Sequence, residues 1–256
     1  MKTFFTKAIV KKPCKNIVHG LTNANLGIPD YNKAMYQHEE YIKALNYCNL
    51  EVTILPEDEG FPDSTFVEDT ALLTSKVAII TNPGAKSRKG ETKDIRNAIE
   101  LHFKNIETIH DPGTIEAGDI MMVGSLFYIG LSERTNAQGA RQMIEILRAY
   151  GMDGKTVTLK EFLHLKSGLS YLEENKLLIS GEFLKMEIFK EFVQIHLPEE
   201  ETYASNSVWI NDKVLIPKGF PVVLEKIREQ GYEPVVLDVS EFQKLDGGLS
   251  CLSLRF

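Results

Sequence analysis

Polar side chains able to do chemistry stand near the start of successive β-rich hairpins in this sequence. The candidate nucleophile is Cys251 and the candidate acid–base group is His164, and they belong to different segments. The acidic and amide members of the set are Asp63, Glu68, Asp69, Glu116, Asp119, Asn206 and Asp246. If equivalent ends of the hairpins face a common axis, these groups converge. A cysteine, a histidine and carboxylates from distant segments form the type of site that a covalent thiol enzyme requires.

Cys251 lies in the segment DGGLSCLSLRF, where a free cysteine could equally be a small core residue of an apolar strand. The pair Gly247-Gly248 lets the backbone approach a ligand closely, although it could simply form a turn. Cys14 and Cys48 have no such setting and are interpreted as structural. The three cysteines show no CxxC and no metal-ligand spacing, so a disulfide framework or zinc ribbon is disfavoured and a reducing cytosol is expected.

His164 is one of six histidines, none of which belongs to an HExxH or another metal pair. It lies in FLHLKSGLSYL between two leucines and before a Ser-Gly break. A strand with period 2 would aim its imidazole away from the side of those leucines. A surface position or a satisfied core position remains the alternative for this side chain.

Two pairs of acids lie inside apolar β-runs, Glu68 with Asp69 in FVEDTALL and Glu116 with Asp119 in TIEAGDIMM. Buried carboxylates need partners because unpaired burial is costly. The partners could be backbone amides, which would make the acids structural. The other partner is a cation in a pocket, and a guanidinium fits because it donates two parallel hydrogen bonds to a carboxylate.

Two arginines, Arg88 and Arg134, lie just beyond the first and second hairpins. Both could be ordinary surface residues, or they could hold a substrate carboxylate if the hairpin ends line a site. Asp30 and Thr135 are interpreted more simply as helix N-caps.

A loose internal repeat supplies the elements that must position these residues. Each unit contains a strand, a turn, a second strand, a helix and a third strand. The expected hairpins are 66–81, 115–131, 169–180 and 207–217, with strands at 106–109 and 232–237. Helices are expected at 31–47, near 91–103, from about 135, near 183–192 and near 222–230. In the helix from about 135, Ala140, Met143, Ile144 and Leu147 form a core-facing stripe.

The last unit offers one clear strand, 249–256, and the N-terminal strand, about 3–11, could complete it, with the strand 52–55 following the helix 31–47. Five units of roughly 40–50 residues would then close into a ring, forming a single domain over residues 1–256. A three-layer α/β fold is the competing architecture. A dinucleotide fold is disfavoured because no GxGxxG follows a strand.

Length and composition agree with one globular protein. The chain has 256 residues with 43% hydrophobic and 25% charged side chains, which excludes a disordered chain or a collagen-like fibre. The net charge of −7 argues against a protein that binds nucleic acid or an anionic membrane. No apolar run is long enough to cross a bilayer, and the first residues do not resemble a signal peptide. The expected location is therefore the cytoplasm.

With these residues in order along the chain, the sequence resembles the dimethylarginine dimethylaminohydrolase family, in its short bacterial form. The resemblance runs from residue 19 to the C-terminus, and the ordered set of motifs makes it specific. The matching segments are HGLTNANLGIPDY, FPDSTFVEDTALL, NPGAKSRKGE, GTIEAGDIMMVG, FYIGLSERTNAQGARQM, HLKSGLSYLE and DGGLSCLSLRF.

The resemblance implies the pentein fold, a five-bladed α/β propeller of ββαβ repeats with pseudo-fivefold symmetry. It also implies a catalytic cysteine, a catalytic histidine and a carboxylate supporting that histidine, which match Cys251, His164 and Glu116. The implied substrate-binding residues match Leu21 on a covering loop, Asp63, Glu68, Asp69, Arg88, Arg134, Leu245 and Asp246. Among these, Asp69 would contact the guanidinium, with Glu68 and Asp63 nearby, and the arginines would contact the amino-acid end.

The activity implied is hydrolysis of dimethylarginine, and of monomethylarginine, to citrulline and the methylated amine through a covalent cysteine adduct. No cofactor and no metal is expected. The expected partner is a small-molecule methylated arginine, with no nucleic acid and no membrane, and a homodimer is possible. Arginine deiminase and amidinotransferase activities are the related alternatives, and those enzymes are longer. A non-catalytic propeller that binds ribosomes would not need Cys251, His164 and the acids together.

Overall fold

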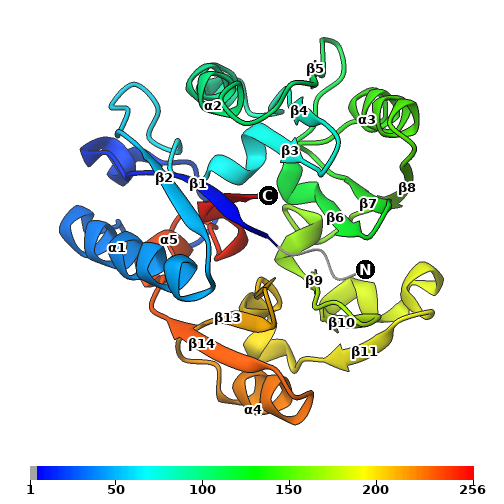
Figure 1. The fold of residues 1–256 in the computed structure, drawn as a ribbon. Coiled ribbons are helices and arrows are strands. Elements are labelled where there is room, and N and C mark those ends of the chain that lie inside the picture. Colours follow the sequence, from blue (N-terminus) through cyan, green and yellow to red (C-terminus); the bar gives the residue numbers. More distant parts are fainter. Residues whose placement is uncertain (1–4) are drawn as a thin grey trace.

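Five three-stranded sheets stand around a central axis in the computed structural model, which describes residues 5–256 (Figure 1). In each sheet the middle strand pairs antiparallel with the inner strand and parallel with the outer strand. The sheets are β3–β4–β5, β6–β7–β8, β9–β10–β11, β12–β13–β14 and β15–β1–β2. The five-unit ring expected from the sequence is confirmed.

The strands are short, between two and six residues. Their bounds are β1 Lys7–Lys11, β2 Glu51–Leu55, β3 Ala71–Leu73, β4 Ala78–Ile80, β5 Ile106–Thr108, β6 Ile120–Val123, β7 Leu126–Leu131, β8 Asp153–Thr158, β9 Leu169–Tyr171, β10 Lys176–Ile179, β11 Val193–His196, β12 Val208–Ile210, β13 Lys213–Pro217, β14 Glu233–Leu237 and β15 Leu254–Arg255. The α-helices are α1 Tyr31–Tyr47, α2 Thr92–Ile99, α3 Ala137–Ala149, α4 Pro221–Glu229 and α5 Ser240–Gln243.

The two ends of the chain share one blade. β1 lies in the middle of its sheet, antiparallel to β15 and parallel to β2, so the N-terminal strand completes the last unit as expected. The strand begins at Lys7, and the first residues of the expected range, Thr3 and Phe4, lie outside the described residues.

Helices cover the outer side of four blades (Figure 1). α1 has the predicted bounds, and its predicted cap is confirmed, because the Asp30 side chain accepts a hydrogen bond from the Lys33 amide. The cap predicted for α3 is wrong. Asn136 caps that helix by accepting from the Gly139 amide, whereas the Thr135 hydroxyl bonds to Asp119.

The third blade departs from the repeat. The helix expected near 183–192 is replaced by two short 3-10 helices, Gly181–Lys185 and Glu187–Phe189. Met186 interrupts them with an extended backbone, and Gly181 adopts a φ of +57°. Buried Phe183 and Phe189 pack into the core from these turns, so the apolar pattern marks burial rather than an α-helix.

Short 3-10 helices lead into the inner strands, and they carry or adjoin most of the polar residues singled out above. They are Val67–Thr70, Ala117–Asp119, Leu165–Ser167, Glu199–Ser205 and Ser250–Leu252. Glu68, Asp69 and Cys251 therefore lie on turns, and the prediction that they lie inside strands is wrong. Neighbouring turns contact one another around the axis, which brings distant segments to one end of the ring.

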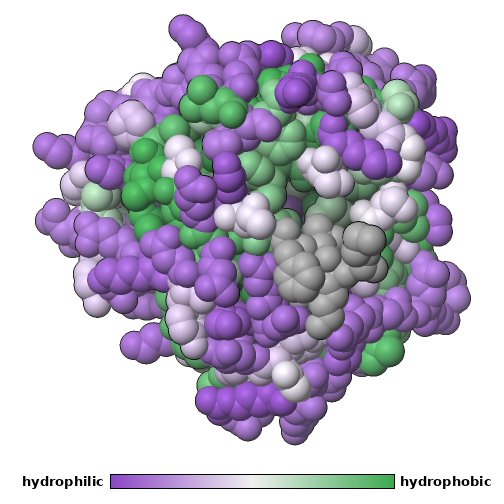
Figure 2. All heavy atoms as spheres, viewed as in Figure 1, coloured by the Kyte–Doolittle hydropathy of each residue, from purple (hydrophilic) through white to green (hydrophobic). Residues whose placement is uncertain are grey.

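Hydrophobic clusters fill the spaces between neighbouring blades. Seen along the axis, the outline of the molecule is mostly hydrophilic, and hydrophobic side chains gather on the left of the view and toward its centre (Figure 2). Over the described residues, none of the helices combines the length and the apolar character needed to span a membrane.

Candidate active site

The predicted site residues converge at one end of the ring. A cavity of about 40 Å³ is lined by ten of the eleven, namely Leu21, Asp63, Asp69, Arg88, Glu116, Arg134, His164, Leu245, Asp246 and Cys251. The eleventh, Glu68, lines a neighbouring cavity of about 50 Å³ that shares His164, Asp246 and Cys251 with the first. Each residue comes from a turn or loop fixed by a blade, so the fold itself assembles the site.

Cys251 is half-buried on the turn before β15, and its sulfur accepts a hydrogen bond of 3.4 Å from the Gly248 amide. Burial raises the pKa of the Cys251 thiol to about 12, and the charges of Glu68 and Asp69 add to this effect. In the empty site the sulfur is therefore a protonated and weak nucleophile at neutral pH.

The glycine pair before Cys251 serves close packing. A Cβ on Gly247 would lie 2.2 Å from the Phe66 ring, and one on Gly248 would lie 2.4 Å from Asn206 Oδ1. The close neighbours of the glycine pair are protein groups, and the expected approach to a ligand stays a prediction.

His164 is paired with Glu116. The His164 Nε2 atom lies 2.8 Å from a Glu116 carboxylate oxygen, and both side chains are buried. Burial by itself lowers the pKa of His164, but the charges of Asp69, Asp119 and Glu116 outweigh it and raise the pKa to about 9. The imidazole is thus an imidazolium at neutral pH, able to donate a proton.

Asp69 is held from two sides. It accepts a 3.0 Å hydrogen bond from the Gly118 amide and a 2.6 Å hydrogen bond from Arg88 Nη1. Arg88 also donates to both oxygens of Glu91, at 3.0 and 3.2 Å from its Nε, and to the Phe66 carbonyl. This buried arginine bonds the acid expected to bind a guanidinium, and it lines the same cavity as Arg134.

Glu91 was not singled out from the sequence. Its pKa is raised to about 7, because burial outweighs the favourable charge of Arg88. A sequence signal exists in its spacing, three residues after Arg88, which places an acid within reach of that guanidinium.

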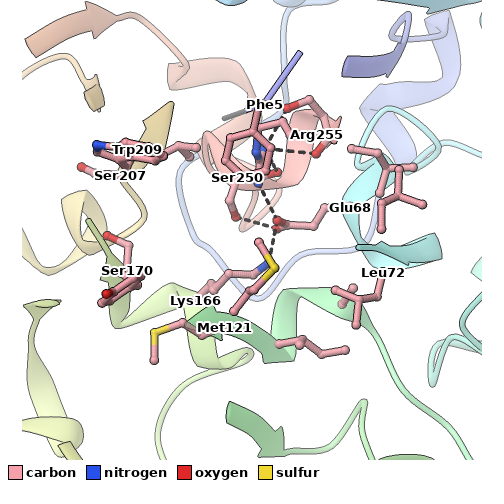
Figure 3. Close-up of a pocket in the computed structure, with 18 of the residues that line it drawn as sticks. Phe5, Glu68, Leu72, Met121, Lys166, Ser170, Ser207, Trp209, Ser250 and Arg255 are labelled. Carbon is pink, nitrogen blue, oxygen red and sulfur yellow. Dashed lines mark hydrogen bonds and ion pairs between the residues drawn. The ribbon is translucent and has the colours of Figure 1, made fainter. Parts of the chain in front are cut away.

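Glu68 separates the site from a cavity on its far side. It accepts hydrogen bonds from Lys166 at 2.6 Å, Ser250 at 2.6 Å and Arg255 at 3.2 Å (Figure 3). The far cavity has a volume of about 140 Å³ and is lined by Glu68, Lys166, Ser250 and side chains of the inner strands. Lys166 and Ser250 were missed as site residues, although Lys166 follows His164 by two positions.

A loop from Gly20 to Pro29 closes over the rim. Asp63 accepts a 2.9 Å hydrogen bond from the Leu21 amide, and burial raises the pKa of the Asp63 carboxyl. Asp246, which has a φ of +57°, accepts from the Asn23 amide at 2.6 Å. These two acids thus hold the loop that carries Leu21.

The arrangement combines a thiol, a charged imidazole and several carboxylates, with Arg134 at the rim. It can bind a cation among the acids and transfer protons beside a sulfur nucleophile. The ligand atoms of Asp69, Glu116 and His164 lie within 4.8 Å of one another, but they already have partners: Asp69 bonds Arg88, and His164 bonds Glu116.

Comparison with known families gives one consistent match. A family model described as N,N dimethylarginine dimethylhydrolase, eukaryotic, matches residues 29–207. A protein of Pseudomonas aeruginosa named N(G),N(G)-dimethylarginine dimethylaminohydrolase is 53% identical over 253 residues, which are 98% of this chain and 100% of that protein. One of the same name from Streptomyces coelicolor is 31% identical and covers 97% of this chain and 96% of its own length.

Solved structures agree with these relatives. The Pseudomonas aeruginosa DDAH, as a cysteine-to-serine mutant complexed with citrulline, matches with a TM-score of 0.98 and 52% identity over 99% of this chain and 100% of that one. A histidine-to-glycine form of a dimethylarginine dimethylaminohydrolase, as an adduct with S-methyl-L-thiocitrulline, gives the same TM-score and identity. The N-terminal domain of ArgZ, a cyanobacterial arginine dihydrolase, shares the fold with a TM-score of 0.88 at 19% identity over 97% of both chains.

Proposed function

Since this chain belongs to the dimethylarginine dimethylaminohydrolase family, we propose that it hydrolyses Nω,Nω-dimethyl-L-arginine to L-citrulline and dimethylamine. Nω-monomethyl-L-arginine would give citrulline and methylamine. Its fold is the five-bladed α/β propeller of the penteins, and it is a hydrolase acting on C–N bonds of linear amidines. Citrulline is bound in a mutant of the Pseudomonas aeruginosa enzyme that lacks a cysteine, and an adduct forms in a related structure that lacks a histidine.

The observation that carries the proposal is the placement of Cys251, His164 and the acids around one cavity. Asp69 and Glu116 are buried carboxylates that suit a guanidinium, and Cys251 and His164 lie at the same cavity. Arg134 and Arg88 would hold the substrate carboxylate, with Leu21 on the covering loop and the backbone of Leu245 also at the amino-acid end.

Substrate binding would itself activate the nucleophile. The acids that raise the pKa of Cys251 are the ones a guanidinium would neutralise, so the bound cation lowers that pKa. Cys251 then loses its proton to solvent and stands as a thiolate beside an electrophilic carbon. The charged His164 remains protonated at this stage.

In the first half of the reaction the Cys251 thiolate forms a bond to the guanidinium carbon. The C–N bond to dimethylamine then breaks, and the nitrogen takes its proton from the His164 imidazolium. Dimethylamine leaves, and a cationic thiouronium adduct remains on the sulfur. Asp69 and Glu116 stabilise the positive charge, in the place where an oxyanion hole would stand in ester hydrolysis.

In the second half the neutral His164 removes a proton from water, and the oxygen attacks the same carbon. The C–S bond breaks, a proton leaves the new ureido group, and citrulline is released with Cys251 restored as a thiolate. Glu116 holds the imidazole in place through both proton transfers.

The decisive experiment compares turnover of dimethylarginine, monomethylarginine and arginine by the purified protein. We expect kcat/KM to be highest for a methylated substrate, whereas faster release of ammonia from arginine would support the deiminase alternative. Absence of turnover with all three substrates would favour a non-catalytic propeller.

Trapping the adduct tests the assigned residues. Mass spectrometry of a quenched reaction should show the adduct on Cys251 and not on Cys14 or Cys48. Cys251→Ser should form no citrulline while remaining folded. Full activity in that variant would refute the assignment.

We further propose that residues 1–256 act as one catalytic domain in the cytoplasm and can form a homodimer, without nucleic acid or membrane as partners. Three unpaired thiols are typical of a reducing compartment. The net charge of −7 does not favour binding to nucleic acid or to an anionic membrane. The chemistry derived above uses no metal and no cofactor.

A further inference from the structure

Asp119 is a fully buried acid that the reaction above does not use. Its Oδ1 atom accepts a 3.0 Å hydrogen bond from the Leu165 amide. Its Oδ2 atom accepts hydrogen bonds from the hydroxyls of Ser132 at 2.7 Å and Thr135 at 2.6 Å. The Asp119 carboxylate thus joins its own turn, the loop that holds Ser132 and Thr135, and the turn that begins at Leu165.

Each of these segments carries a residue of the candidate site. Leu165 directly follows His164, and Ser132 and Thr135 flank Arg134 in the loop after β7. The Ser132 hydroxyl also accepts hydrogen bonds from the amides of Arg134 at 3.0 Å and Thr135 at 3.1 Å.

Glu116, the partner of His164, is attached to the same group. The Thr135 hydroxyl, while donating to Asp119, accepts a 3.2 Å hydrogen bond from the Glu116 amide. The acid, the histidine and the rim arginine are therefore all linked to Asp119 through one intervening residue.

The backbone of β7 packs close against the Asp119 carboxylate. A Cβ on Gly130 of β7 would lie 2.8 Å from Asp119 Oδ1 and 3.2 Å from the Leu165 Cβ. The glycine lets the strand pass close to this carboxylate, which suits a fixed junction more than a solvated surface acid.

We propose that Asp119 is a positioning residue of the reaction, whose carboxylate fixes His164, Glu116 and Arg134 in one relative arrangement and supplies negative charge beside His164. The inference rests on the proposed function, because it concerns the residues assigned there. An amide at this position would keep the size of the side chain but lose the charge, and its NH2 group would face two hydroxyls that now donate.

The charge has a measurable effect because several groups act on the same imidazole. Asp69, Asp119 and Glu116 raise the pKa of His164 against the effect of burial. The other charged or titratable groups at the two cavities that His164 lines are Asp63, Glu68, Arg88, Arg134, Lys166, Tyr203, Asp246 and Cys251. Removing the Asp119 charge leaves these in place and lowers the pKa of His164.

The test uses Asp119→Asn in the full chain. We expect kcat/KM for dimethylarginine to fall by about 10- to 100-fold, as for partners that orient a functional histidine from behind. The high-pH limb of the kcat/KM profile should move to lower pH, because without the Asp119 charge the His164 imidazolium loses its proton at a lower pH. NMR titration of the His164 ring in the unliganded protein should show the same shift.

Two variants separate charge from position. Ser132→Ala removes one hydrogen bond to Asp119 but keeps its charge, so KM should rise while the high-pH limb stays in place. Asp153→Asn makes the same chemical change at an exposed acid on β8 of the same blade, and neither quantity should change.

The Thr135 pair keeps the proposal testable if Asp119→Asn does not fold. Thr135→Val removes the hydroxyl that joins Glu116 to Asp119 and should lower kcat/KM, whereas Thr135→Ser keeps it and should retain activity. Equal activity in these two variants would overturn the proposal.

A folded Asp119→Asn protein with the wild-type His164 titration and wild-type kcat/KM would also overturn it. Failure of the proposed function is distinguishable, because the wild-type protein would then form no citrulline, while the NMR shift between wild type and Asp119→Asn could still be measured.

Discussion

The thiol of Cys251 lies among groups that oppose its ionisation. Burial raises the pKa of Cys251, and the charges of Glu68 and Asp69 raise it further. Without a bound cation, the sulfur is therefore protonated at neutral pH. Such a thiol reacts slowly with oxidants and other electrophiles until a cation occupies the acids. At the scale of the residue, reactivity is thus conditional on the substrate.

Glu68→Gln should make the free thiol more reactive. Loss of the Glu68 charge lowers the pKa of Cys251, and each unit of such a fall increases the thiolate fraction about tenfold at a pH below the pKa. Iodoacetamide labelling of Cys251 at pH 8, followed by mass spectrometry, measures this rate. Ser250→Ala is the matched control, because it removes a hydrogen bond to Glu68 but keeps the charge. A wild-type labelling rate in Glu68→Gln would contradict the assignment.

His164 should make folding stability depend on pH. Its folded pKa of about 9 exceeds the ordinary value of 6.5, so the stability it contributes is fully present below about pH 6.5. That contribution is lost as the pH rises through 9. The difference in unfolding free energy between wild type and His164→Gln should shrink by on the order of 3 kcal/mol from pH 6 to pH 9.5. A difference that stays constant in urea unfolding at both pH values would refute the charged imidazole.

Turns and loops, more than regular elements, carry the site. Short 3-10 helices present Asp69 and Cys251, and the loop 20–29 closes the rim. The regular elements fix where those turns stand, and single hydrogen bonds fix the loop. At the scale of the element, a substitution that removes one hydrogen bond of the loop therefore affects access to the cavity more than it affects the fold.

Thr22→Ala should loosen the loop. The Thr22 hydroxyl donates a 2.8 Å hydrogen bond to the Lys244 carbonyl, and losing about 1 kcal/mol would increase the open fraction about fivefold. Limited proteolysis within residues 20–29 should become faster, and KM for dimethylarginine should rise. Asn25→Ala, at an exposed position of the same loop, is the control, and equal proteolysis of the two variants would argue against this latch.

The sequence predicts elements well where local signals and tertiary packing agree. α1 has both an Asp30 cap and an amphipathic pattern, so its bounds are correct. The residues 183–192 carry the same kind of apolar spacing, but Gly181 and Met186 break the backbone into turns. Thr135 has the composition of a cap, and only the fold reveals Asp119 as its partner.

The site was predictable as a set of residue types, and less so as a set of contacts. Cys251, His164 and Glu116 meet as expected, because their hairpins occupy equivalent places in the repeat. The pairing of Arg88 with Glu91 and of Glu68 with Lys166 depends on side-chain directions that no periodicity encodes. The partner of a buried charge depends on which side chains the tertiary structure brings next to it, and the sequence alone does not show this.

The ring joins blades through shared hydrophobic clusters, so at the scale of the whole molecule no blade stands alone. Leu254 of β15 packs with Ile9, Val67 and Ala71, which come from other strands and turns. Leu254 and Ile9 belong to the blade that holds both chain ends, and with Val67 and Ala71 they form a cluster that connects this blade to the first.

Leu254→Ala should destabilise the entire ring by about 2–5 kcal/mol, since it removes a buried side chain and leaves a cavity. Leu101→Ala, at an 80% exposed leucine, should change stability by less than about 0.5 kcal/mol. Urea unfolding can be followed by circular dichroism and by fluorescence of Trp209, the single tryptophan, which lies in the fourth blade. The two midpoints should shift together, and an unchanged Trp209 transition would contradict one cooperative domain.

The sharing of one blade by β1 and β15 has a consequence for the order in which the molecule matures. Ala8 pairs with Arg255, almost the whole chain away, so this closure orders a very long loop and is among the slowest contacts to form. Cys251 stands on the turn just before β15, whereas Asp69 and Glu116 belong to blades built from local contacts. During folding, the cation-binding acids would therefore come together first, and Cys251 would reach its place last. The chain would be able to bind a guanidinium before it could react with one.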